Sequence, residues 1–349
     1  MSMQVALIGL GMVAQTHARA IAATNGKVSL RGVLSRSKES AEAFLTEASD
    51  IFPNAPKAYA GLQELVSDQD LDFVIVCTPP NARADIVSAL ADRGLPILME
   101  KPIERTYQAA EEIVRRCETA AVPLGIVFQH RMRASAKQLK RVLKQGTLGQ
   151  IAMVEISVPW WRAQSYYDEP GRGTYQRDGG GVLISQAIHT LDLALSLTGP
   201  IIEVQSMAAK TSLHDLEAED FVSAGLRFDN GAVGSLVAST ASFPGGAESI
   251  TLHCQHGSAV LKSGQLELLM HDGSIDTFGE ESATGGGADP MAFTHEWHQA
   301  VIEDMADAIV DKRAPICSGR EALRVHRLIQ ALIQSATQKS AVAIPQLES

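Results

Sequence analysis

Residues 4–14 read Gln-Val-Ala-Leu-Ile-Gly-Leu-Gly-Met-Val-Ala, and this stretch decides the fold. An apolar run typical of a buried strand leads into Gly9, Gly11 and Ala14, which stand in the register G-x-G-x-x-A. Glycines at such a turn let the backbone approach a pyrophosphate, and the following helix offers unpaired N–H groups at its N-terminus. An ordinary turn between a strand and a helix is the alternative interpretation. The position at the start of an alternating pattern favours a dinucleotide-binding opening.

A second apolar run, residues 96–99, ends in Glu100-Lys101-Pro102. In a parallel sheet the carboxyl ends of the strands meet at the edge where ligands bind. A lysine there is suited to hydrogen-bond a substrate hydroxyl and to stabilise the alkoxide that develops during hydride transfer. For an isolated Glu-Lys-Pro, a surface lysine after a strand is the simpler interpretation. Together with the glycine turn, the pattern indicates nicotinamide chemistry with a lysine beside it.

Composition narrows the class of protein. The chain has 349 residues and a net charge of −10, with 30 basic and 40 acidic side chains. This length favours two domains, and without a dense basic run neither nucleic acid nor an anionic membrane is an expected partner. No apolar stretch approaches the ~18 residues of a membrane span. The lack of a basic run favours a small molecule as the partner. The four cysteines are far apart and predict reduced thiols in a cytoplasmic protein. They are Cys77, Cys117, Cys254 and Cys317.

The order of apolar runs predicts two domains of different class. Across residues 1–124, short apolar runs alternate with helical patterns, which indicates an α/β fold with a doubly wound parallel sheet. The expected strands are residues 5–8, 29–34, 73–77, 96–99 and 124–128. Residues 125–349 carry several short strands and two helices, near 182–197 and 292–310, which predict an α+β domain. Its sheet is expected to be largely antiparallel and open on one face.

The residues after the second expected strand bear on cofactor choice. An NAD enzyme usually has an Asp or Glu there to hold the ribose hydroxyls, whereas this chain has Ser35-Arg36-Ser37-Lys38. A guanidinium can bind a 2′-phosphate and stack on adenine. We therefore expect NADP(H) to be preferred, with NAD(H) possible. The alternative is that Arg36 is only a solvated turn residue.

Three glycines, Gly179 to Gly181, precede a helix that carries Ser185, His189 and Asp192. The glycines permit close approach of a ligand or of another backbone segment. The helical spacing i, i+4, i+7 puts the three polar residues on one face. Histidine is the side chain best suited to exchange an alcohol proton near neutral pH, and a neighbouring carboxylate can set its tautomer. A buried structural histidine is the alternative.

At this point the motifs resemble the glucose-fructose oxidoreductase/inositol dehydrogenase family, often called Gfo/Idh/MocA. The resemblance runs nearly from end to end of the chain and rests on five motifs. They are Gly9-x-Gly11-x-x-Ala14, Cys77-Thr78-Pro79-Pro80-Asn81, Glu100-Lys101-Pro102, Gly179-Gly180-Gly181 with His189-x-x-Asp192, and Gly319-Arg320-Glu321-Ala322-Leu323. It implies a Rossmann domain that binds nicotinamide and a second domain with an open-faced sheet. It also implies a homodimer or homotetramer, and Lys101 and His189 as the catalytic pair.

The chain departs from this family pattern at two positions. Many members carry an acid four residues before the catalytic histidine, where this chain has Ser185, and a histidine in the helix after T-P-x-N, where this chain has Arg83. A serine supplies no charge. Asp192 or Gln186 is therefore expected to orient His189, unless the proton relay differs, and Asp192 joins Lys101 and His189 among the catalytic candidates.

Substrate contacts are expected from aromatic and basic groups after the last Rossmann strand. Aromatic faces stack on sugar rings and arginine holds carboxylate or phosphate, although packing is as good an explanation. The candidate substrate-binding residues are Lys101, His130, Trp161, Arg162, Gln186 and His189. The candidate cofactor-binding residues are Gly9, Gly11, Met12, Val13, Ser35, Arg36, Thr78, Pro79, Asn81, Glu100 and Lys101. No metal is expected, because His253-Cys254 point to opposite faces of a strand and the histidines of 295–298 are three residues apart.

The function predicted from these motifs is hydride transfer between nicotinamide and a secondary alcohol or ketone of a sugar, cyclitol or related polyol. A non-catalytic dinucleotide sensor is the alternative from another class, and the presence of both Lys101 and His189 argues against it. A reductase of the same fold acting on a non-sugar diol differs only in its pocket.

Overall fold

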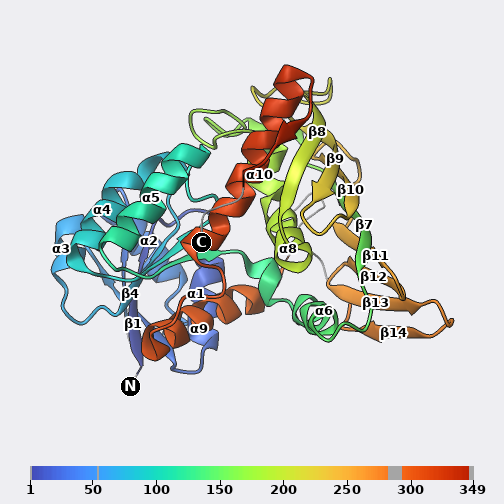
Figure 1. Ribbon diagram of the computed structural model, residues 1–349. Coiled ribbons are helices and arrows are strands. Elements are labelled where there is room, and N and C mark those ends of the chain that lie inside the picture. Colours follow the sequence, from blue (N-terminus) through green and yellow to red (C-terminus); the bar gives the residue numbers. More distant parts are fainter. Residues whose placement is uncertain (1, 53–54, 282–292, 346–349) are drawn as a thin grey trace. The chain divides into compact units, whose positions relative to one another are not determined.

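The computed structural model describes residues 2–52, 55–281 and 293–345, which fall into two compact units (Figure 1). Of the described residues, unit 1 comprises 2–52, 55–104, 108–129 and 294–322, and unit 2 comprises 105–107, 130–281, 293 and 323–345. Unit 1 thus includes a segment near the C-terminus that lies in the part of the sequence assigned above to the second domain. Among the described residues, no helix is long and apolar enough to cross a membrane.

Unit 1 contains a six-stranded parallel sheet in the order β3-β2-β1-β4-β5-β6. Its strands are β1 (Met3–Ile8), β2 (Val28–Leu34), β3 (Lys57–Ala58), β4 (Phe73–Val76), β5 (Ile97–Glu100) and β6 (Leu124–Val127). This is the strand order of a dinucleotide-binding doubly wound sheet, with its switch point between β1 and β4. The central strand β4 is apolar and buried throughout, and so is β1 from Val5 onward, because helices cover both faces of the sheet. The α/β prediction is confirmed.

The helices of unit 1 pack on this sheet (Figure 1). They are α1 (Ala14–Ala23), α2 (Lys38–Glu47), α3 (Leu62–Ser67), α4 (Ala84–Arg93), α5 (Tyr107–Thr119) and α9 (Glu296–Asp311). The late helix α9 packs against α1, β2 and β6. Its buried side chains include Val301, Ile302 and Met305, at the spacing of one helical face. This face of α9 is therefore part of the core of unit 1.

Unit 2 is built on a nine-stranded sheet in the order β14-β13-β12-β11-β7-β10-β9-β8-β15. Its strands are β7 (Ile151–Pro159), β8 (Ile201–Ala209), β9 (Phe221–Phe228), β10 (Val233–Ser239), β11 (Ser249–Cys254), β12 (Gly257–Lys262), β13 (Gln265–Met270), β14 (Ile275–Phe278) and β15 (Val342–Ala343). Neighbouring strands pair antiparallel except β7 and β10, which run parallel. The prediction of a largely antiparallel sheet is confirmed.

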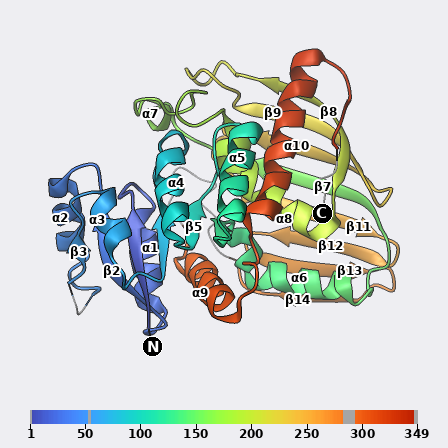
Figure 2. The ribbon, with the colours of Figure 1, turned by 60° about the vertical axis from the view of Figure 1, so that its left-hand side comes forward.

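One face of this sheet is covered by helices (Figure 2). The other face carries exposed apolar side chains. The covering helices are α6 (Ala134–Lys144), α8 (Ile188–Thr198) and α10 (Gly319–Gln338), the last of which begins in unit 1. Burial alternates along β9 and β10, as expected when only one face packs on a core. On the other face, Met207 is 59% exposed, Val233 47% and Val237 44%.

The helix expected near residues 182–197 begins differently from the prediction. Residues Leu183–Ala187 form a π-helical turn, and the regular helix α8 starts only at Ile188. A π turn holds more residues than an α turn, so Ser185 does not precede His189 by one regular α turn. The argument from i, i+4 spacing therefore does not apply to Ser185. Its hydroxyl instead donates to the Gly181 carbonyl at 2.5 Å.

Candidate active site

Three loops of unit 1 leave the sheet at the same edge, because they follow the carboxyl ends of adjacent parallel strands. Gly9 follows β1 and its N–H donates to the Leu34 carbonyl of β2 at 2.9 Å. Cys77 follows β4 and its N–H donates to the Ile8 carbonyl of β1 at 2.7 Å. Lys101 follows β5, which pairs with β4. The structure therefore brings the predicted cofactor segments of unit 1 to one edge.

Two glycines of the first turn serve different purposes. A Cβ atom on Gly9 would lie 2.7 Å from the Thr78 nitrogen and 2.9 Å from the Cys77 carbonyl carbon, and Gly9 has a φ of +90°. Side chains are excluded there by the fold itself. A Cβ atom on Gly11 would meet nothing within 4 Å. The space beside Gly11 is open, and no described side chain caps α1 at Val13, so this turn fits a bound pyrophosphate.

The remaining cofactor candidates lie around this turn or on the neighbouring loops. Met12 is 51% exposed and Val13 is half-buried, directly before α1. Pro79 and Asn81 are exposed on the loop after β4. Arg36 is exposed after β2, beside Ser37, whose hydroxyl accepts from the Ser40 N–H at 3.2 Å and caps α2.

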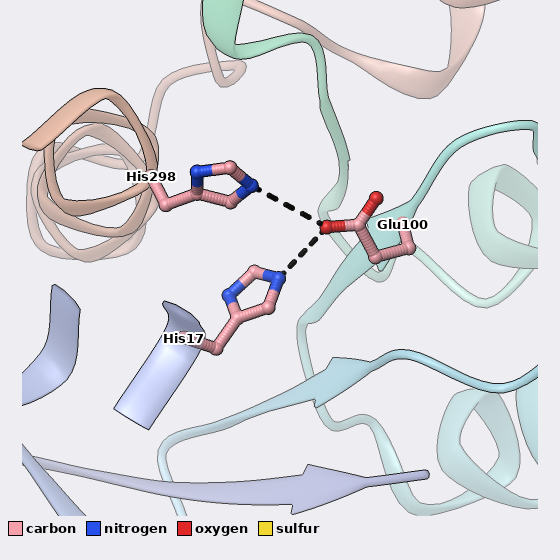
Figure 3. A group of neighbouring side chains, drawn as sticks. All are labelled: His17, Glu100 and His298. Carbon is pink, nitrogen blue, oxygen red and sulfur yellow. Dashed lines mark hydrogen bonds and ion pairs between the residues drawn. The ribbon is translucent and has the colours of Figure 1, made fainter. Parts of the chain in front are cut away.

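Glu100 is the centre of a buried cluster that the sequence analysis missed (Figure 3). Its Oε1 lies 2.8 Å from Nε2 of His17 on α1 and 3.8 Å from Nε2 of His298 on α9. Both histidine rings point at the carboxylate, and all three residues are buried. The position of His17 on the helix after the glycine turn was a usable signal for the first contact. Nothing local points to His298, which lies almost two hundred residues further along the chain.

The charges in this cluster follow from its contacts. Burial opposes a charge on His17, but Cys77 and the Glu100 carboxylate outweigh it and raise the pKa of His17. Burial likewise opposes a charge on Glu100, yet hydrogen bonding and the charge of His17 lower the pKa of this carboxyl to about 2. Burial and the charge on His17 lower the pKa of His298 to about 3. The cluster is therefore an ion pair of His17 and Glu100 beside a neutral His298.

The candidate ligand atoms of the same three residues lie within 4.8 Å of one another, close enough to bind one metal ion. Two ligands that share a tetrahedral Zn²⁺ at about 2.0–2.1 Å lie about 3.4 Å apart. The 2.8 Å between His17 and Glu100 is instead the length of a charge-assisted hydrogen bond. The cluster fits a charge network better than a metal site, and the expectation of no metal stays a prediction.

In unit 2, two of the three glycines before α8 lie against other backbone segments. A Cβ atom on Gly181 would lie 1.7 Å from the Glu219 carbonyl oxygen, and one on Gly179 would lie 2.5 Å from the Arg105 Cα. The Glu219 carboxylate accepts from the N–H groups of Gly181 and Leu183, both at 3.1 Å. Close approach of backbone, one of the two reasons considered for these glycines, therefore explains Gly179 and Gly181. Glu219 fixes the start of the π-helical turn.

His189 is buried on α8 and stacks on the ring of His130, with centroids 4.9 Å apart. Nε2 of His130 lies 2.6 Å from a guanidinium nitrogen of Arg133. Because arginine can only donate, this nitrogen of His130 accepts, and the ring is neutral with its proton on Nδ1. Arg133 also donates to Glu248 at 2.7 Å. His189 thus stacks on the neutral imidazole of His130, which is held in place by the Arg133–Glu248 ion pair.

Asp192 forms a buried, bidentate ion pair with Arg131. Nε and Nη2 of Arg131 donate to the two carboxylate oxygens at 2.7 and 2.6 Å. Such a planar pair fixes both side chains and holds the segment after β6 against α8. Sequence reasoning expected Asp192 to serve His189 and named no partner for Arg131.

The other candidate substrate-binding residues of unit 2 lie before α8 and directly after β7. Gln186 is buried in the π-helical turn before α8. Trp161 packs edge-on against Phe243, with ring centroids 5.4 Å apart. Arg162 is 2% exposed and lies over the ring of Trp160 at 5.3 Å. These are contacts of packed side chains, and a role of Trp161 and Arg162 in substrate binding stays a prediction.

The sheet order, the open glycine turn and the strand-end lysine define the class of protein as a dinucleotide-binding, doubly wound α/β fold with a second sheet unit. Residues 3–128 match the model of the oxidoreductase family with an NAD-binding Rossmann fold, and residues 136–260 match the GFO/IDH/MocA C-terminal domain. The chain therefore belongs to the GFO/IDH/MocA family of oxidoreductases, and the resemblance inferred from its motifs is confirmed.

Individual relatives differ in how much of their length the match covers. The chain is 30% identical to the rhizopine catabolism protein MocA of Rhizobium meliloti over 55% of this chain, which spans about half (56%) of that relative. It is 24% identical to inositol 2-dehydrogenase of Rhizobium meliloti (strain 1021) over 99% of this chain and 100% of that relative. The WlbA dehydrogenase of Bordetella pertussis, solved with NADH and UDP-GlcNAcA, matches with a TM-score of 0.83 and 25% identity over 99% of this chain and 100% of that one.

Proposed function

We propose that this protein transfers hydride between a bound nicotinamide and a secondary alcohol or ketone of a sugar, cyclitol or related polyol. The observation that carries the proposal is that Gly11, Thr78 and Lys101 follow three adjacent parallel strands of unit 1. A pyrophosphate beside Gly11 and a reactive lysine at one sheet edge suit a dinucleotide and an oxygen-bearing substrate. The names of relatives that act on inositol, together with the sugar nucleotide bound to WlbA, support the substrate class.

In this function Lys101 and His189 form the catalytic pair. The Lys101 ammonium donates a hydrogen bond to the substrate oxygen and stabilises the negative charge that develops on it. His189 takes the hydroxyl proton when an alcohol is oxidised and returns it in reduction. Asp192 acts on this step through Arg131, by fixing α8 against the segment that carries His130. The nicotinamide supplies the hydride chemistry when bound.

Unit 1 binds the cofactor in this proposal and unit 2 supplies most substrate contacts. We propose a preference for NADP(H), supported by Arg36 after β2, where residues 35–38 contain no acid. The apolar side chains on the open sheet face support a homodimer or homotetramer. Four free cysteines support a cytoplasmic location.

The test is a spectrophotometric screen of cyclitols, aldoses, anhydro sugars, sugar acids and nucleotide sugars with NAD⁺ and NADP⁺. Lys101→Met and His189→Asn are expected to lower turnover at least tenfold and to leave cofactor affinity nearly unchanged. Lys57→Met, which removes an exposed lysine of β3, is the matched control. Full turnover in Lys101→Met refutes the assigned pair. No turnover across the panel, with cofactor binding intact, favours the dinucleotide sensor.

For the cofactor preference, NADH and NADPH affinities are measured for the wild type and for Arg36→Ala. Tighter NADPH binding that is lost in the variant supports the preference. Equal affinities in the wild type refute it.

A further inference from the structure

Arg83 is an arginine that is 2% exposed, at the N-terminus of α4, and all its hydrogen bonds in the described part of the chain end on backbone carbonyl oxygens. Nε and Nη2 donate to the Thr78 carbonyl at 2.9 and 2.7 Å. Nη1 donates to the Glu100 carbonyl at 2.5 Å, to the Pro102 carbonyl, and to the Ile103 carbonyl at 3.4 Å. One side chain thus joins the loop after β4 to the loop after β5.

These acceptors surround Lys101 in the sequence. The Glu100 carbonyl precedes it and the Pro102 carbonyl follows it, so the guanidinium holds the backbone on both sides. Thr78 lies on the loop whose first residues pack against Gly9. Only a planar group with several N–H donors in fixed directions reaches both loops at once, and a lysine ammonium at the same depth could reach fewer of these oxygens.

The charge of Arg83 is also buried. Burial lowers the pKa of its guanidinium to about 10, and the nearby Glu100 carboxylate opposes that shift, so the group stays charged at neutral pH. A buried cation bound only to carbonyls costs more free energy than neutral donors in the same place. Structural stability alone is therefore a poor reason for an arginine here.

We propose that Arg83 is a positioning residue for Lys101, whose backbone it fixes from both sides. The inference rests on the proposed catalytic function of Lys101. The role differs from that of the His17 and Glu100 pair, which holds the Glu100 side chain and not the backbone of the loop.

The test compares four proteins in one assay: wild type, Arg83→Met, Lys101→Met and the double variant. Turnover of Arg83→Met with the best substrate of the carbohydrate panel is expected to fall about 10- to 100-fold in kcat, with KM for that substrate changed less than threefold. Arg83→Lys is expected to recover part of the loss. In the Lys101→Met background, Arg83→Met is expected to lower kcat less than threefold further, because the residue it positions is gone. Losses that multiply would overturn the inference.

A matched control lies at the other end of the same helix. Arg93 ends α4 and also donates to a backbone carbonyl, that of Val66, at 3.2 Å. Arg93→Met is expected to leave kcat unchanged. Amide hydrogen exchange of the peptide spanning residues 97–104 needs no substrate, and it is expected to speed up at least tenfold in Arg83→Met but not in Arg93→Met. Unchanged exchange in Arg83→Met overturns the inference even if Lys101 proves catalytic. Full activity of Lys101→Met overturns the proposed pair instead.

Discussion

Alanine substitutions at Gly9 and Gly11 distinguish a glycine that folding requires from a glycine that cofactor binding requires. Gly9 has a φ of +90°, and its Cβ atom would lie 2.7 Å from the Thr78 nitrogen. Gly11 has no left-handed φ and no neighbour within 4 Å of the added atom. We expect Gly9→Ala to destabilise the protein and Gly11→Ala to spare its stability but weaken cofactor binding. Gly26, with a φ of +85° and open space, provides a third variant that isolates the cost of the backbone angle.

The magnitudes follow from these contacts. A left-handed φ costs an alanine about 1–2 kcal/mol. Relieving a 2.7 Å approach to an ordinary 3.4 Å contact requires β1 and the loop after β4 to separate, at about 1–3 kcal/mol for such a packed site. Gly9→Ala is therefore expected to lose about 2–5 kcal/mol and Gly26→Ala only about 1–2 kcal/mol. Gly11→Ala is expected to be neutral or to gain up to about 1 kcal/mol through the unfolded chain.

The assays are thermal unfolding followed by circular dichroism and titration of the folded variants with NADH and NADPH. We expect Gly11→Ala to unfold like the wild type and to bind either dinucleotide at least tenfold more weakly. The contact argument is refuted if Gly9→Ala unfolds no earlier than Gly26→Ala. The cofactor argument is refuted if Gly11→Ala keeps wild-type affinity for both dinucleotides.

Three further predictions concern stability. His298 has a lowered pKa in the folded protein, so below pH 6.5 the unfolded chain binds a proton there that the folded protein does not bind. The free energy of unfolding of the wild type should therefore fall by up to about 1.4 kcal/mol per pH unit from pH 6.5 towards pH 3. Urea unfolding at pH 7, 6 and 5 should show a shallower fall for His298→Asn. Gly181→Ala should abolish or severely impair folding, judged by soluble yield and circular dichroism, whereas Gly225→Ala, with open space around it, should not. Asp192→Asn should cost about 3–5 kcal/mol in urea unfolding because it leaves a buried arginine without its carboxylate, and Glu203→Gln at an exposed pair should cost under about 1 kcal/mol.

The sequence predicted the parallel sheet well because each central strand is a short, continuous apolar run bounded by turn residues. The runs near Val5, Phe73 and Ile97 all form buried strands within one or two residues of the expected bounds. The strand Lys57–Ala58 was not predicted, since two residues carry no periodic signal. The π-helical turn was not predicted either, and the contact of Gly181 with Glu219 at its start joins residues far apart in the chain.

The candidate site was predictable where a local motif carries it and not where distant side chains meet. Lys101 and the glycine turn follow from spacing and strand ends. The contacts of Glu100 with His298 and of Asp192 with Arg131 join residues 61 or more positions apart. No local pattern in a single sequence predicts such contacts. Arg83 was recognised only as a departure from the family pattern, since burial and its carbonyl contacts appear only in three dimensions.

Because residues 294–322 belong to unit 1, this unit cannot be completed until late in the synthesis of the chain on the ribosome. The sheet strands of unit 1 leave the ribosome with the first 129 residues, but α9, which packs on α1 and β6, follows about 165 residues later. At a synthesis rate of roughly 5–20 residues per second, the surface of α1 and β6 stays without α9 for roughly 10 to 30 seconds. During that interval the strands of unit 2 from β7 to β14 are synthesised, and His298, the third member of the cluster with His17 and Glu100, is not yet present. The first half of the protein to emerge is therefore completed late, and a chaperone has time to act on it.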